Sequence, residues 1–402
     1  MNTFWLFLIS VLYILGWRFL GIGFLDLSLI ISCILIYLYI RPTWKLVPHK
    51  MTFIITSVIF LVMALYVAFS TFGDDLSLIN RAIRLPISIL GGACLAYLFR
   101  KKSMSTLNSL VVISLSIAVN AMFAILMFLS PDIRDLVYSI TGATKILNYT
   151  TTIAAGIRNP GLTYGLSQTS IFQSIGVMIA LIALTKFNTT KSQKIILIST
   201  IFLNVLSCFF IGRSGLLLSA ILLLVFGFSS FKRMIATSVI ALLMCGVYVL
   251  GVSDSSKESV KIQIERAEEI IDIMSGKETT TTENMAHMYV LPENYFSLAF
   301  GGQGMGRSDN YYLDSDVGYA RIIFAVGIYG VIIYLSFFIY TIICTKSRSE
   351  KELNLILYVI VIISLIYNFK ELFFYSRNVW QVYCLIFGLV IFNEMRPSTN
   401  NK

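Results

Sequence analysis

The stretch MTFIITSVIFLVMALYVAFS, residues 51–70, decides the fold class. It contains no charged side chain, and its length is what an α-helix needs to cross a hydrocarbon layer of roughly 30 Å. The whole 402-residue chain has the same character, because 57% of its residues are hydrophobic and only 13% are charged. That apolar fraction is far above what the core of a soluble domain requires. We therefore expect an all-α integral membrane protein.

Comparable apolar stretches recur along the chain and predict about twelve transmembrane helices in a single polytopic domain, residues 1–402. The N-terminal stretch has no basic residue ahead of it and no small-residue cleavage site behind it, so we expect no cleaved signal peptide. All six cysteines fall inside these stretches, and no disulfide is expected. The predicted spans cover approximately residues 3–17, 22–40, 51–70, 86–99, 108–129, 168–185, 195–211, 214–230, 234–252, 317–344, 353–369 and 379–393.

The basic residues predict the orientation of these helices. If both termini are cytoplasmic, the inner loops hold sixteen of the 31 basic residues and only three of the 21 acidic ones. This distribution follows the positive-inside tendency of membrane proteins. The net charge of +10 is therefore explained by topology, and nucleic acid is not an expected partner.

Two predicted outer loops are long, at residues 131–167 and 253–316, whereas every inner loop is short. We expect the function to lie on the outer face. The larger loop contains an amphipathic pattern over about 256–275, which predicts a helix that lies on the membrane surface, or alternatively a lid over a substrate. The glycine-rich GGQGMG at 301–306 is typical of a tight turn, with a phosphate-binding loop as the alternative.

Arginines stand at the outer ends of several predicted spans. A guanidinium near hydrocarbon is costly, so such arginines tend to face a bundle interior or a wet cavity. Each one alone could instead reach the lipid headgroups or pair with a carboxylate such as Asp314, Asp316 or Glu371. As a set they predict the binding of a polyanion, and a diphosphate suits their planar fork. The four candidates are Arg158, Arg213, Arg321 and Arg377.

The same loops offer groups for proton transfer. Asp314, Asp316 and His287 are the candidates for a general base that would activate a sugar hydroxyl. Either aspartate is alternatively a structural partner of Arg321, and a lone loop histidine is often structural as well. The chain has only two histidines, and His49 falls on the cytoplasmic side. We therefore expect neither a metal site nor another cofactor.

Tyrosines accumulate in the outer loops. Their rings are typical of an interfacial belt, and they also suit stacking against sugars. Tyr311 and Tyr312 are the pair proposed for sugar contact, with Tyr164 as a third candidate.

Three segments together resemble a known family. They are RNPGLTYGLSQTS at 158–170, FIGRSGLLLSAILLLV at 210–225, and the series of the glycine-rich turn, Asp-Ser-Asp at 314–316, Arg321 and GIYGVIIYL at 327–335. This pattern is similar to the bacterial repeat-unit polymerases of O-antigen and capsule, the Wzy type, within a wider polymerase and ligase superfamily. The likeness covers about residues 150–390.

The resemblance implies a GT-C-like, inverting and metal-independent glycosyltransferase in the bacterial cytoplasmic membrane, with its active site on the outer face. Such an enzyme transfers a glycan from undecaprenyl diphosphate to the non-reducing sugar of another lipid-linked repeat unit. The resemblance assigns the diphosphates to Arg158 and Arg213, with Arg321 next. It implies lipid-linked oligosaccharides, membrane lipids and a chain-length regulator protein as partners.

Three other functions remain open at this point. In the related ligases a histidine of this loop is thought to activate the acceptor, so His287 keeps an O-antigen ligase as an alternative. A flippase for lipid-linked oligosaccharides would have a similar number of helices and a positively charged cavity, but its alternating halves do not need long outer loops. A purely structural or anchoring protein would have little use for so many outer arginines.

Overall fold

The computed structural model describes residues 3–17, 26–141, 158–163, 165–227, 275, 287–305, 315–346 and 351–392. The described residues form helices and connections, without a β-strand among them. In the described part of the chain, seven helices are long and apolar enough to cross a membrane, with Gly318–Thr345 counted as one. The prediction of an α-helical, multi-pass membrane protein is thus confirmed in the described part of the chain. The number of twelve spans stays a prediction.

The helix contacts divide the chain into two compact units. Unit 1 comprises Met1–Ile31 and Ser103–Lys277, and unit 2 comprises Ser32–Lys102 and Glu278–Lys402. Helix α2 (Leu27–Leu46) contributes residues to both units. Each unit is described by itself below.

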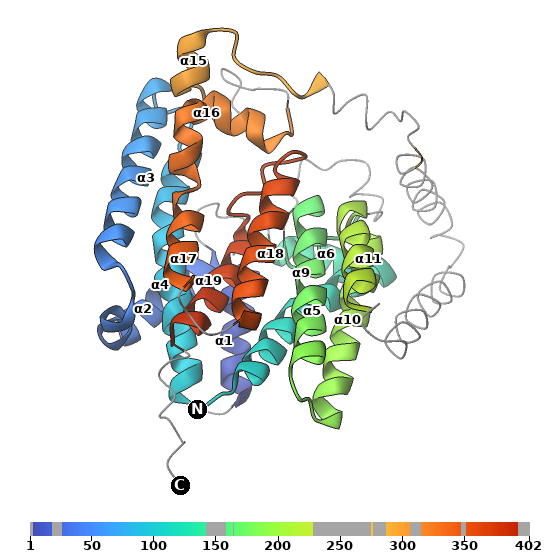
Figure 1. Cartoon of the computed structure of the whole chain (residues 1–402). Helices are drawn as coiled ribbons and strands as arrows, with labels where there is room; N and C mark the ends of the chain where they lie inside the picture. The colour runs from blue at the N-terminus through green and yellow to red at the C-terminus, as the bar shows by residue number, and fades with distance from the viewer. Residues whose placement is uncertain are drawn as a thin grey trace. The chain divides into compact units, whose positions relative to one another are not determined.

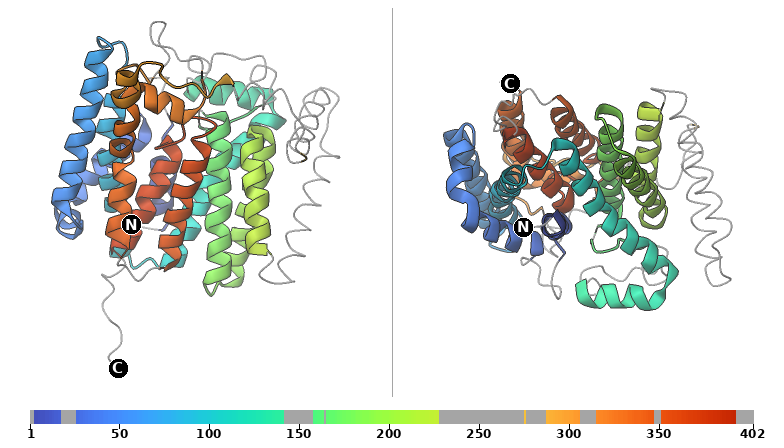
Figure 2. Two further views of the ribbon diagram at one scale, coloured as in Figure 1. Left: turned by 45° about the horizontal axis from the view of Figure 1, so that its top comes forward. Right: turned by 90° about the horizontal axis from the view of Figure 1, so that it is seen from below.

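Unit 1 is a bundle around a buried central helix. It contains α1 (Thr3–Leu15), α5 (Thr106–Leu129), α6 (Pro131–Thr141), α9 (Leu166–Lys186), α10 (Lys191–Ile211) and α11 (Arg213–Gly227). Helices α5, α10 and α11 all pack against α9 (Figures 1 and 2). Every residue of α9 from Thr169 to Ala183 is buried, as expected for a helix that is apolar or small on all sides.

Unit 2 contains α3 (Lys50–Ser70), α4 (Ser77–Lys101), α15 (Tyr295–Phe300), α16 (Gly318–Tyr334), α17 (Ser336–Thr345), α18 (Lys351–Tyr367) and α19 (Arg377–Phe392) (Figure 1). Helices α4 and α19 run parallel and form the most extensive helix pair. A Cβ on Gly388 would lie 2.8 Å from the Ala96 Cβ and 2.9 Å from the Gly92 carbonyl oxygen. Small residues bring these backbones together, as is common between membrane helices.

The glycine-rich turn of unit 2 supports a break in α16. Gly327 has φ 68° and ψ 177°, a conformation that only glycine adopts without strain. The carbonyl oxygens of Ala325 and Phe324 accept hydrogen bonds from the amides of Gly302 and Gln303, both at 3.0 Å. These two amides are therefore committed to α16, which favours the turn over the phosphate-binding loop for this stretch.

The fourth predicted span was wrong at its start. The sequence suggested a short helix from residue 86, whereas α4 begins at Ser77 and runs through Pro86. Arg81 and Arg84 therefore belong to a membrane helix.

The predicted span at 234–252 lies outside the described residues, as does the predicted amphipathic helix at 256–275 apart from Ser275.

Candidate functional site: arginines at the helix ends of two units

In unit 1, the segment that carries Arg158 is bound to the end of α10. The Asn159 amide donates to the Phe210 carbonyl at 2.8 Å. Arg213, the first residue of α11, follows Phe210 by three positions. Arg158 and Arg213 therefore come from segments that meet at one end of this unit. The convergence of the two guanidinium groups around one anion stays a prediction.

A buried asparagine of α5 holds the same segment. The side-chain nitrogen Nδ2 of Asn120 donates to the Pro160 carbonyl at 3.2 Å, and its side-chain oxygen Oδ1 accepts from the Leu162 backbone amide at 2.8 Å. Gly161 has φ 71°, and a Cβ there would lie 2.7 Å from the Asn120 carbonyl oxygen. Irregular backbone among membrane helices needs such partners, because water is scarce there. The sequence analysis did not identify Asn120, although a polar side chain within the apolar span 108–129 indicates that the residue has a specific role.

Asn120→Leu is expected to lower the stability of unit 1 by about 2 kcal/mol, because a buried amide and a buried carbonyl each lose a partner. It should also reduce whatever activity depends on Arg158. Thermal unfolding of the purified protein in detergent measures the first effect. Asn108→Leu is the matched control: Asn108 lies on the exposed surface of the same helix, where its side-chain oxygen accepts a hydrogen bond from Gln193. Equal melting temperatures of the two variants would contradict the role of Asn120.

The start of α11 is fixed against α9 by small residues. The Gly215 amide donates to the Ser170 hydroxyl at 3.1 Å, and the Gly215 carbonyl accepts from Ser174 at 2.6 Å. Ser219 donates to Ser174 at 2.9 Å. These bonds leave no space for a side chain at Gly215, where a Cβ would lie 2.1 Å from the Ser170 carbonyl oxygen. The backbone position of Arg213 is set by this contact two residues further on.

In unit 2, two of the proposed proton-transfer groups come from neighbouring segments. The Ser315 hydroxyl donates to the Met288 carbonyl at 2.6 Å. His287 precedes Met288, and Asp316 follows Ser315. Both His287 and Asp316 are exposed. The structure thus brings the backbone around these two residues together.

The connection between α18 and α19 gathers several of these segments. Its Asn368 carbonyl accepts from the Tyr319 amide, and its Phe369 carbonyl accepts from the Tyr289 hydroxyl at 2.6 Å. The Asn368 side chain accepts from the amides of Phe373 and Phe374 at 3.1 and 3.3 Å. Arg377, which is half-buried, begins α19 directly after this connection. His287, Asp316 and Arg377 therefore all flank one connection of unit 2.

Arg321 and Arg81 bind main-chain oxygens of unit 2. The Arg321 guanidinium donates to the Met305 carbonyl through Nε at 3.1 Å and through Nη2 at 2.6 Å. Arg81 donates through Nη1 to the Tyr334 hydroxyl at 2.6 Å and to the Phe374 carbonyl at 3.0 Å. Arg81 was missed as a site residue, because the predicted helix boundary at 86 placed it in a loop.

Tyr375 is a buried residue of the connection between α18 and α19. Its hydroxyl donates to the Tyr334 carbonyl at 2.6 Å. Burial raises the pKa of the Tyr375 phenol well above its usual range. The phenol is therefore neutral at physiological pH and can donate this hydrogen bond. Tyr375 and Tyr334 together position Arg81.

Four of the predicted site residues lie outside the described part of the chain: Asp314, Tyr311, Tyr312 and Tyr164. The side chain of Arg213 is likewise outside it. Among the described residues, no group of three or more histidine, cysteine, aspartate or glutamate side chains could hold a metal ion.

Each unit therefore presents arginines at helix ends, and unit 2 adds a carboxylate and an imidazole from neighbouring segments. Guanidinium groups near a membrane suit the oxygens of phosphates, and a carboxylate or imidazole can accept a proton from a hydroxyl. The chain matches no family model, and no similar protein was found among curated proteins or solved structures.

Proposed function

We propose that this chain is an integral-membrane glycosyltransferase that polymerises lipid-linked repeat units for O-antigen or capsule. It transfers a glycan from undecaprenyl diphosphate to the non-reducing sugar of another lipid-linked unit, at the outer face of the cytoplasmic membrane. The proposal includes about twelve spans in a GT-C-like arrangement, with both termini in the cytoplasm. The observation that carries it is the bond between the Asn159 amide and the Phe210 carbonyl, because it brings the segments of Arg158 and Arg213 to one end of unit 1.

The chemistry requires a cation where the leaving group departs. Expulsion of a lipid diphosphate from the anomeric carbon builds negative charge on its oxygens, and fixed guanidinium groups in a low-dielectric site stabilise that charge. Arg158 and Arg213 would hold the diphosphate, and Arg321 and Arg377 are further candidates. Asp316, Asp314 or His287 would accept the proton of the attacking hydroxyl.

Deletion of the gene, followed by gel analysis of the surface glycan, tests this function. We expect glycans that carry a single repeat unit, because transfer to the cell surface continues without polymerisation. Long polymer that accumulates on the carrier lipid would instead identify a ligase. A complete absence of surface glycan would identify a flippase, and an unchanged glycan would refute all three functions.

One observation favours the ligase as a second candidate. Ser315 binds the carbonyl of Met288, so His287 and Asp316 lie on neighbouring segments of unit 2. An exposed histidine beside a carboxylate is a suitable base for an acceptor hydroxyl. His287→Ala separates the two proposals by its product. A ligase that loses its base leaves long polymer on the carrier lipid, whereas a polymerase leaves single repeat units if His287 is its base and normal chains if an aspartate is.

A further inference from the structure

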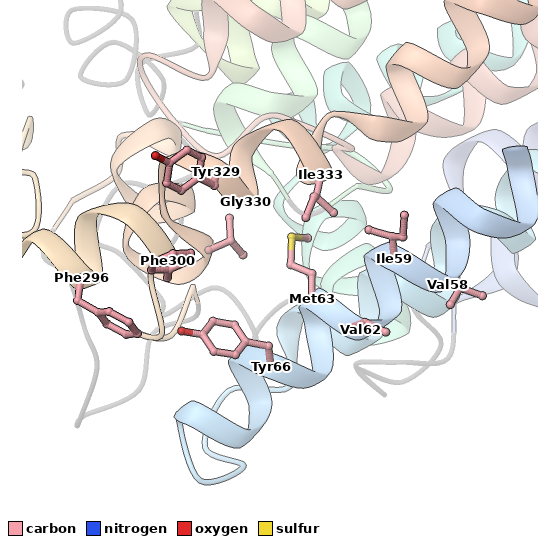
Figure 3. A pocket seen from close by; sticks show the side chains of 11 residues that line it. Val58, Ile59, Val62, Met63, Tyr66, Phe296, Phe300, Tyr329, Gly330 and Ile333 are labelled. Carbon is pink, nitrogen blue, oxygen red and sulfur yellow. The ribbon is translucent and has the colours of Figure 1, made fainter.

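Unit 2 contains an apolar groove between α3 on one side and α15 and α16 on the other (Figure 3). Its volume is about 650 Å³, which is within the range of sites for small molecules. Figure 3 shows aliphatic side chains of α3, including Val62, along one wall and the rings of Phe300 and Tyr329 on the opposite wall. Tyr66 and Phe296 lie at one end. No charged side chain lines it.

The groove belongs to a surface that faces hydrocarbon. Helix α3 is one of the candidate membrane spans, and its Val62 side chain is 60% exposed although it lines the groove. A groove in such a helix pair opens toward lipid, so an apolar chain is the occupant that fits it. A row of aromatic rings runs from the end of the groove along its opposite wall: the ring centres of Phe296 and Phe300 lie 5.2 Å apart, and those of Phe300 and Tyr329 lie 5.8 Å apart.

The turn that covers one end of the groove also binds a cation. A Cβ on Gly302 would lie 3.2 Å from the Tyr66 hydroxyl, so the glycine-rich turn covers the Tyr66 end. Met305 of the same turn binds the Arg321 guanidinium through its carbonyl. The Arg321 side chain is therefore bound to the turn that covers the Tyr66 end of the groove. An amphiphile with an anionic head and a long apolar chain complements this arrangement.

We propose that this groove holds the polyprenyl chain of one of the two lipid-linked diphosphate substrates, with the diphosphate of that substrate toward the turn at Gly302–Met305 and Arg321. The proposal rests on the proposed function. A polyprenyl chain carries a methyl branch and a double bond in every unit, and these groups pack well against the mixture of valine, isoleucine and aromatic side chains in the groove. A straight acyl chain has neither feature.

The test uses purified full-length protein in phosphatidylcholine nanodiscs and an undecaprenyl phosphate probe with a photoreactive diazirine in its chain. We expect the crosslinks to map to α3, α15 and α16. Val62→Trp should reduce the labelling about tenfold, because the indole fills the groove and removes apolar contacts worth roughly one decade of affinity. Val62 is too exposed for this change to disturb the core.

Leu61→Trp is the matched control, since Leu61 lies beside Val62 on the same helix, is 38% exposed and does not line the groove. It should leave labelling unchanged. Equal labelling of the two variants, or crosslinks that map elsewhere, would overturn the proposal. Unlabelled undecaprenyl phosphate should compete with the probe, whereas equal competition by phosphatidylglycerol would show a groove for any lipid chain and would refute the polyprenyl assignment.

This outcome is separable from that of the proposed function. If deletion of the gene shortens the glycan but the probe labels the Val62→Trp variant normally, the polymerase function is supported and the assignment of the groove to the polyprenyl chain is wrong. If deletion leaves the glycan unchanged but Val62→Trp loses labelling, the protein binds polyprenyl lipids through this groove for another purpose.

Discussion

Arg158→Ala is expected to abolish long glycan chains while the protein remains in the membrane at its normal level. A guanidinium that stabilises the departing diphosphate acts at the point where charge develops, and removal of one such donor typically costs about a hundredfold or more in rate. Arg158→Lys should also impair chain growth, because an ammonium cannot copy the planar fork that binds two phosphate oxygens. The measurement is the length distribution of surface glycan in a deletion strain complemented with each variant.

Arg134→Ala is the control for Arg158→Ala. Arg134 lies on α6 of the same unit and forms a 3.7 Å ion pair with its neighbour Asp135. Arg134 is 17% exposed and Asp135 is 67% exposed, so solvent reaches this pair from its carboxylate side, and an ion pair that solvent reaches contributes little to stability. We expect full-length glycan from this variant. Normal glycan from Arg158→Ala as well would remove the proposed role of Arg158, and full activity of Arg158→Lys would show that charge alone is sufficient.

The membrane class and most helix positions could be predicted from the sequence, because hydropathy acts over a window and needs no tertiary information. The start of α4 could not. Arg81, Arg84 and Pro86 all argue locally for a loop, but the Arg81 guanidinium is bound by Tyr334 and the Phe374 carbonyl. Those partners are more than 250 positions away along the chain, so no local pattern could indicate them.

The break in α16 shows the same limit. The sequence predicted one continuous span over 317–344, and Gly327 and Gly330 lie in an otherwise helical pattern. What stabilises the break is the pairing of the Gly302 and Gln303 amides with α16 carbonyls. A helical pattern with two glycines is compatible with a straight or a broken helix, and the decision depends on that separate segment.

Of the candidate site, too, only a part could be predicted from the sequence. The arginines were predictable, because charge at the end of a span is costly and conspicuous. Their neighbourhoods were not: Asn120 holds the Arg158 segment, and Ser170 and Ser174 fix the start of α11. These contacts depend on the register between helices, which hydropathy does not specify.

Gly215→Ala is the second substitution for which we expect a large effect. The new Cβ would lie 2.1 Å from the Ser170 carbonyl oxygen, and main-chain atoms of a buried helix cannot turn aside as a side chain can. The first turn of α11 must therefore move outward, and its bonds to Ser170 and Ser174 are lost. We expect a loss of about 3 kcal/mol in stability, at the upper end of the usual cost of overpacking.

The same movement should reduce chain growth by about a hundredfold, since a displacement of about 1 Å in a positioning group has that effect on a reaction. Arg213 is two residues from the contact and would move with it. Thermal unfolding, monitored through the labelling of the Cys208 thiol, measures the stability. Cys208 is fully buried beside Ser170 and reacts only when this packing opens.

Gly212→Ala separates crowding at Gly215 from a general intolerance of this turn. Gly212 has φ −179°, which is extended backbone that any residue adopts. Its Cβ would lie 3.3 Å from the Ser170 hydroxyl and 3.5 Å or more from every other atom, so a small shift accommodates it. We expect near-normal stability and long glycan from this variant. If Gly212→Ala and Gly215→Ala were equally active and equally stable, α11 would not depend on the contact with Ser170, and the position of Arg213 would have to be set by other residues.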